Sequence, residues 1–185
     1  MSLQLELDQE RQIQEHLNEL TSRTTYVFVL ATVFTFGWLS QIDQILDVLL
    51  SRLNPCEEGC LNLFDPARWS AVRWMSSAIL GVATAAPFAF YHGWKFARPG
   101  LLPTEQRWVK AWFFGGSITL VLAVLTTLGV VFPFLFESGH QTHESMQLGA
   151  RYDAVHMLSM AVAVVWTQVI VACALSAMVL AGCFG

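Results

Sequence analysis

Residues 111–136 read AWFFGGSITLVLAVLTTLGVVFPFLF and contain no charged side chain. A second charge-free run covers the 32 residues that follow Asp153. Each run exceeds the roughly 18 apolar residues that indicate a membrane-spanning helix. Over all 185 residues the charged fraction is 13%, about half of what a soluble domain carries. These runs predict a polytopic membrane protein and exclude the soluble enzyme classes.

The same criterion, applied outward from these runs, predicts a single all-α membrane domain with four spans. The spans are expected at about 26–42, 74–94, 111–136 and 154–180. Ahead of the first span, Ile13, Leu17 and Leu20 recur with helical spacing in a polar segment. This pattern predicts an amphipathic helix at about 9–23 that lies at the membrane interface. In the second span Pro87 lacks a backbone donor and is expected to kink the helix.

The basic residues near the span ends predict the orientation. With the N-terminus inside, six basic residues face the cytoplasm and four face the outside. Four of those six lie in the short loop between the second and third spans: Lys95, Arg98, Arg107 and Lys110. The N-terminus and this loop are therefore predicted to be cytoplasmic, with the loops at about 51–70 and 137–153 outside.

Cys56 and Cys60 bracket a charged loop, and the sequence leaves their chemistry open. A disulfide is one interpretation, and it requires the oxidising side of the membrane. Two free thiols are the second interpretation. A metal site is the third, although zinc would need more ligands than two thiols.

No motif in the sequence predicts catalysis. His143-Glu144 is followed by Gln147 where a zinc-protease helix needs its second histidine. No glycine loop for phosphate is present, and a net charge of −4 gives no basic surface for nucleic acid. We predict that the chain is not an enzyme and holds no cofactor, metal or nucleic acid.

Two carboxylates, Glu19 and Glu105, stand just before predicted spans on the cytoplasmic side. Two interpretations are open. Glu19 can lie on the wet face of a helix while Glu105 is a first-turn acid behind an N-cap Thr104. Alternatively, the two converge on a cationic ligand, because carboxylates bind guanidinium groups in a directional, bidentate way.

Three stretches of the sequence carry a family resemblance. HLNEL at 16–20, followed by Arg23, resembles the N-terminal signature of the TatC family, the polytopic core of the twin-arginine protein translocase. APFAFYHGWKFARPGLLPTEQR at 86–107 resembles that family's most characteristic segment, in which Pro87, Pro99 and Gly100 match. Phe132-Pro133-Phe134 is similar to the Phe-Pro near the outer end of the family's third span.

The resemblance implies that Glu19 and Glu105 bind the arginine pair in the signal peptides of folded precursors. It places Phe96 and Arg23 on the same cytoplasmic recognition surface. It also implies TatA- and TatB-type single-span partners, a homo-oligomer within the translocase, contact with membrane lipid, and transport driven by the proton-motive force. The implied location is the plasma membrane rather than the thylakoid.

Gln168 is a lone amide within the last predicted span, where members of the family carry Glu or Gln. An intramembrane polar group is either functional or engaged in a hydrogen bond between helices. The family has six spans and this sequence supplies about four. It is either an unusual short form or, as we expect, a C-terminally truncated fragment. Two other functions stay open, namely a small-molecule or ion transporter and a non-catalytic membrane scaffold.

Overall fold

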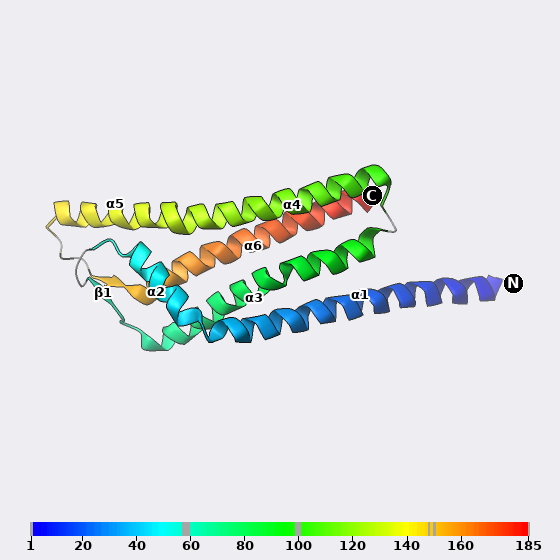
Figure 1. Ribbon diagram of the computed structural model, residues 1–185, viewed down its shortest axis with the longest axis horizontal. Helices are drawn as coiled ribbons and strands as arrows, with labels where there is room; N and C mark the ends of the chain where they lie inside the picture. The colour runs from blue at the N-terminus through cyan, green and yellow to red at the C-terminus, as the bar shows by residue number, and fades with distance from the viewer. Residues whose placement is uncertain (1, 57–59, 99–100, 148, 150, 185) are drawn as a thin grey trace.

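The computed structural model describes residues 2–56, 60–98, 101–147, 149 and 151–184. It confirms the all-α prediction, since helices make up nearly all of the described chain (Figure 1). The helical elements are α1 (Ser2–Leu39), α2 (Ile42–Leu53), α3 (Pro66–Ala97), α4 (Pro103–Thr126), η2 (Thr127–Val131), α5 (Phe132–Ser145) and α6 (Ala154–Phe184). Two short strands, β1 (Leu61–Asn62) and β2 (Tyr152–Asp153), pair in parallel.

Three helical segments in the described chain are long and apolar enough to cross a membrane. They are α3, the continuous rod α4–η2–α5 and the Ala154–Val179 part of α6. A fourth is counted if Leu17–Leu39 of α1 and α2, which meet at 68°, form one broken span. The chain is therefore a multi-pass membrane protein.

Several helices run further than the predicted spans. The predicted interfacial helix and first span are one unbroken helix, α1, and α5 continues to Ser145 through much of the predicted outer loop. The start of α3 lies well before residue 74 because Asp65 caps it. Its Oδ1 accepts hydrogen bonds from the backbone N–H groups of Ala67 and Arg68, and Pro66 follows as the first helical residue.

The helices α1 and α3 pack closely, as Figure 1 shows along much of their length. Gly81 of α3 is buried against α1. A Cβ at this position would lie 2.8 Å from the backbone nitrogen of Thr35 and 2.9 Å from the carbonyl oxygen of Ala31. Nearby, Trp38 Nε1 donates a 2.9 Å hydrogen bond to Thr84 Oγ1. Gly81 therefore sets how near the two helices can approach.

At the end of the bundle away from both termini, α2 folds across the other helices (Figure 1). An ion pair between Asp43 and Arg73, with Nε–Oδ1 at 2.8 Å and Nη2–Oδ2 at 2.9 Å, ties α2 to α3. The main cluster of buried residues also lies here, where α2, α3, α5 and α6 meet. It comprises Ile42, Leu46, Leu53, Val72, Phe132, Val155, Met157, Leu158, Ala161 and Val162.

The two prolines within spans differ in their surroundings. The helix α3 continues through Pro87 without interruption. Just before Pro133, however, the backbone widens into the π-helical turn η2, in which the Phe132 N–H donates to the Thr127 carbonyl. A proline ring would press on the carbonyl four residues earlier in a regular helix, and the wider turn gives it room. Pro99 and Gly100 lie outside the described residues.

Candidate functional site

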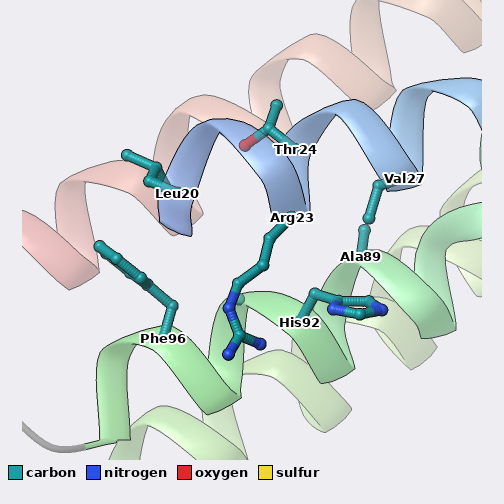
Figure 2. Close-up of a pocket in the computed structure, with 8 residues that line it drawn as sticks. Leu20, Arg23, Thr24, Val27, Ala89, His92 and Phe96 are labelled. Carbon is teal, nitrogen blue, oxygen red and sulfur yellow. The ribbon is translucent and has the colours of Figure 1, made fainter. Parts of the chain in front are cut away.

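A cavity of about 200 Å³ opens between α1 and α3 (Figure 2). Its lining is apolar apart from a few polar groups, and it is contributed equally by the two helices. The lining residues are Leu20, Arg23, Thr24 and Val27 from α1, and Ala89, His92, Gly93 and Phe96 from α3. The cavity thus brings Arg23 and Phe96, two of the sequence-predicted site residues, together.

Arg23 extends from α1 toward α3, between Phe96 and His92 (Figure 2). Its Nη2 and Nε lie 2.5 Å and 3.0 Å from Oε1 of Glu19, one helical turn earlier. The arginine side chain is 19% exposed, whereas that of Glu19 is 49% exposed. Glu19 is therefore the more exposed partner, and it is connected to the cavity through Arg23. A pair of this kind on one helix contributes only about 0.3–0.5 kcal/mol, so an incoming ligand can exchange with it.

His92 is a cavity residue that the sequence reasoning missed. Its ring lies against Tyr26 of α1, with centroids 5.2 Å apart. Within the described chain, the buried Nδ1 of His92 has no hydrogen-bond partner. The spacing of Ala89, His92 and Phe96 by three and four residues was the available signal, because residues at that spacing share one face of a helix.

Glu105 lies in the first turn of α4, and its side chain helps to hold the start of that helix. Its Oε2 accepts a 2.8 Å hydrogen bond from the backbone N–H of Leu102. Leu102 is the N-cap and Pro103 the first helical residue, so the predicted N-cap at Thr104 is wrong. The predicted first-turn position of Glu105 is correct, and its carboxylate caps the backbone N–H of the N-cap residue. Glu105 is not among the described residues that line the α1–α3 cavity.

Comparison with known protein families decides the relationship. The sequence matches the family described as "TatC: Sec-independent protein translocase protein (TatC)" over residues 15–183. The chain belongs to the TatC family. This confirms the assignment made from the signature segments at 16–23 and 86–107.

A curated relative with low sequence identity also belongs to the TatC family. It is named "Sec-independent protein translocase protein TatC", comes from Methanocella arvoryzae, and is 24% identical over 129 residues. The aligned region covers 70% of this chain and 53% of that protein. This TatC chain therefore spans about half the length of the curated relative it matches. No solved structure matches it.

In this TatC chain Gln168 makes a hydrogen bond between helices. Its Nε2 donates to Thr127 Oγ1 over 2.7 Å, which links α6 to the first residue of η2. The amide oxygen Oε1 is buried and has no partner within the described chain. The side chain therefore holds α6 against the π-helical turn, and it also retains one unsatisfied acceptor.

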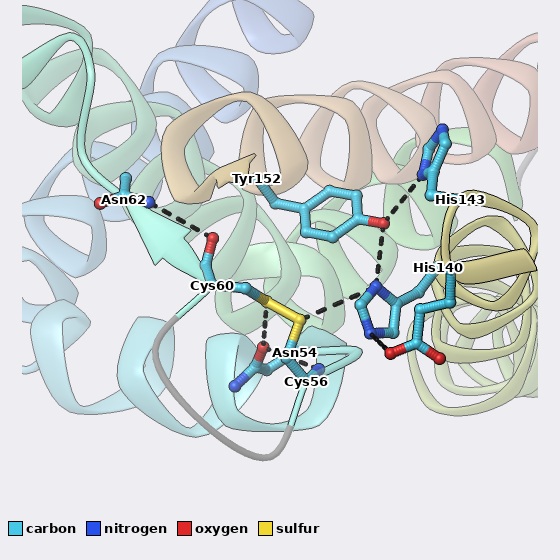
Figure 3. The surroundings of a disulfide bond; sticks show 8 residues. Asn54, Cys56, Cys60, Asn62, His140, His143 and Tyr152 are labelled. Carbon is cyan, nitrogen blue, oxygen red and sulfur yellow. Dashed lines mark hydrogen bonds and ion pairs between the residues drawn. A yellow bond between two sulfur atoms is a disulfide. The ribbon is translucent and has the colours of Figure 1, made fainter. Parts of the chain in front are cut away.

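In the segment that follows α2 of this TatC chain, a disulfide joins Cys56 and Cys60 (Figure 3). His140 Nδ1 lies 3.9 Å from Cys56 Sγ and 3.3 Å from the hydroxyl oxygen of Tyr152. That hydroxyl also lies 3.2 Å from His143 Nδ1. Of the three interpretations left open by the sequence, the structure contains the disulfide. Nowhere in the described ranges do three His, Cys, Asp or Glu side chains come together as a metal site.

The phenol of Tyr152 is expected to titrate at unusually high pH. Burial raises its pKa above the ordinary value, and the nearby carboxylates of Glu144 and Glu137 raise that pKa further. A folded protein that keeps a proton after the unfolded chain has lost it is less stable at high pH. The stabilisation is complete below the unfolded pKa of about 10 and is lost as the pH rises through the folded pKa of Tyr152.

The difference in ultraviolet absorbance between the parent protein and Tyr152→Phe, followed against pH, isolates this phenol. The midpoint should lie above 10, and Glu144→Gln should lower it. A midpoint at or below 10 contradicts the assigned environment.

Proposed function

We propose that this chain is the receptor subunit of a twin-arginine translocase and binds the arginine pair of signal peptides on folded precursors. The observation that carries the proposal is the α1–α3 cavity, which Arg23 helps to line, together with the exposed carboxylate of Glu19 that is bound to Arg23. Arg23 and Phe96 from the predicted site line this cavity. An apolar pocket beside a surface carboxylate suits a peptide that carries both guanidinium groups and apolar side chains.

The carboxylates of Glu19 and Glu105 can each accept a hydrogen bond from a further arginine. The hydrogen bonds from Arg23 fall on Oε1 of Glu19, and the hydrogen bond from Leu102 falls on Oε2 of Glu105. A carboxylate has two oxygens and about four acceptor positions. One oxygen of each group is therefore oriented by the protein, and the other can accept a hydrogen bond from a signal-peptide guanidinium.

The proposal includes the membrane orientation and the partners. The N-terminus lies toward the same end of the bundle as the α3–α4 connection (Figure 1). Basic residues flank that connection, which by the positive-inside rule favours a cytoplasmic position in a plasma membrane. TatA- and TatB-type single-span subunits and further copies of the chain would complete the translocase, and the proton-motive force would drive transport.

A binding experiment with Glu105→Gln tests the receptor site. The amide oxygen of glutamine can still accept a hydrogen bond from the Leu102 N–H, so the substitution removes the charge while the helix start is kept. Loss of a charge-assisted hydrogen bond costs about 1.5–3 kcal/mol, or about a 10- to 150-fold rise in Kd. Fluorescence anisotropy of a labelled Arg-Arg signal peptide, with the full chain in nanodiscs, measures this change.

Glu137→Gln is the matched control, because Glu137 is an exposed carboxylate on α5 whose described partner is Gln141. It should leave Kd unchanged, and a Lys-Lys peptide should bind the parent protein more weakly than the Arg-Arg peptide. Equal affinity for the two peptides, or unchanged binding by Glu105→Gln, would refute arginine recognition. Solute flux through the reconstituted chain alone would favour the transporter function instead.

A further inference from the structure

The Cys56–Cys60 disulfide lies where three segments of the chain meet (Figure 3). The Cys60 carbonyl accepts a 2.9 Å hydrogen bond from the Tyr152 N–H, which connects the segment after α2 to β2. The hydroxyl of Tyr152 contacts His140 and His143 of α5. Both cysteines are only half-buried, so a thiol reagent from the surrounding solution can reach them.

The two sulfur atoms have chemically different neighbours. Cys56 Sγ lies 3.9 Å from His140 Nδ1, and the other ring nitrogen of His140 lies 3.4 Å from Glu144 Oε1. Either ring nitrogen of a histidine can carry a proton, so Nδ1 of His140 can donate a hydrogen bond to a thiolate at Cys56 and stabilise it. If the disulfide is cleaved, Cys56 therefore has a partner that favours the anionic form.

Cys60 has the opposite environment. Its Sγ lies 3.7 Å from Asn54 Oδ1. The orientation of this amide is fixed, because the Cys56 backbone N–H donates to the same oxygen over 3.2 Å. An amide oxygen can accept from a thiol S–H but repels a thiolate. Of the two sulfurs, Cys56 is therefore the better leaving group.

We propose that Cys56–Cys60 is a directional thiol–disulfide exchange site for an external dithiol. A thiolate of the dithiol attacks Cys60 Sγ, the bond between the two cysteine sulfurs breaks, and Cys56 leaves as a thiolate beside His140. The second thiolate of the dithiol then attacks the mixed disulfide and releases Cys60. The dithiol is oxidised to a disulfide, and the protein gains two electrons and two protons.

The position of attack gives a direct test that a purely structural disulfide would not satisfy. Cys173→Ser/Cys183→Ser leaves only this pair of cysteines. Glutathione, a monothiol, is added to the full chain at pH 7, the reaction is stopped with iodoacetamide, and peptides are mapped by mass spectrometry. The glutathione adduct is expected on Cys60 and the alkyl group on Cys56. Adducts mainly on Cys56, or divided equally, would overturn the proposed direction.

The rate of reduction tests the role of His140. Leaving-group basicity controls exchange rates, so His140→Asn should slow reduction by dithiothreitol roughly tenfold. His143→Asn is the matched control, since its side chain contacts Tyr152 and should leave the rate within about twofold. Equal slowing by both substitutions would overturn the assignment, as would alkylation of both cysteines before any reductant is added. The tests require no signal peptide and are independent of the proposed receptor function.

Discussion

Gly81→Leu is expected to separate α1 from α3 and to lower the free energy of unfolding by about 3 kcal/mol. Even the first added carbon would meet the Thr35 hydroxyl, the Thr35 nitrogen at 2.8 Å and the Ala31 oxygen at 2.9 Å. Two of these atoms belong to the α1 backbone, so no rotamer change relieves the contact. Unfolding in mixed micelles of increasing SDS content measures the loss, and binding of the Arg-Arg peptide should fall with it because both helices line the cavity.

Gly116→Leu is the matched control, since an added Cβ there meets nothing within 4 Å. It should change the unfolding free energy by less than about 0.5 kcal/mol. Gly81→Ala combined with Thr35→Ala separates the two kinds of contact. Removing the hydroxyl should recover only part of the stability lost in Gly81→Ala, and the interaction energy follows from the double-mutant cycle. Full recovery would show that the backbone contacts do not limit the approach of the helices.

Leu158→Ala is expected to lower the unfolding free energy by about 2–5 kcal/mol. Leu158 has 0% exposure and lies in the buried cluster where α2, α3, α5 and α6 meet. Its truncation leaves a cavity that the surrounding helices can only partly fill. The same SDS titration measures the effect, and the loss should appear without any change in the order of peptide affinities.

Leu175→Ala makes the same chemical change on the same helix at a side chain with 47% exposure. Lipid tails are as apolar as a leucine side chain, so a leucine that faces lipid gains little when the protein folds. Its truncation should therefore cost much less free energy of unfolding than the truncation of Leu158. If both substitutions cost the same, the packed cluster does not contribute specifically to stability.

Much of the architecture could be predicted from the sequence because the length of an apolar run is a local property. The charge-free residues 111–136 fall within the α4–η2–α5 rod, and those after Asp153 form α6. Helix ends were less accurate. The start of α4 was misplaced by giving Thr104 the cap, although Pro103 carried the signal for a first helical residue.

Features that depend on contacts between helices could not be predicted in this way. Nothing local distinguishes Gly81, which α1 closely approaches, from Gly116, which has open space around it. Nor does a local pattern show that Thr127, the first residue of the π-helical turn, accepts a hydrogen bond from Gln168 on another helix. The disulfide stayed one of three interpretations because it requires the oxidising side of the membrane, which the two cysteines do not themselves reveal.

In the candidate site, too, local pairs could be predicted from the sequence and contacts between helices could not. Glu19 and Arg23 are one helical turn apart, so the sequence alone places them together. Phe96 joins Arg23 only because α1 and α3 pack side by side. Glu105 is not in the lining of that cavity, so its part in the site belongs to the proposed function, which the Glu105→Gln binding experiment tests.

The α4–η2–α5 rod has a consequence for the surrounding bilayer. Its 43 residues span about 65 Å at 1.5 Å per residue, and its charge-free section alone is about 39 Å long. The hydrocarbon core of a typical bilayer is about 30 Å thick. The rod must therefore tilt, or thicken the lipid around it. A thinner membrane is expected to increase this tilt, which would bring His140 and His143 of α5, and the disulfide beside His140, closer to the headgroups.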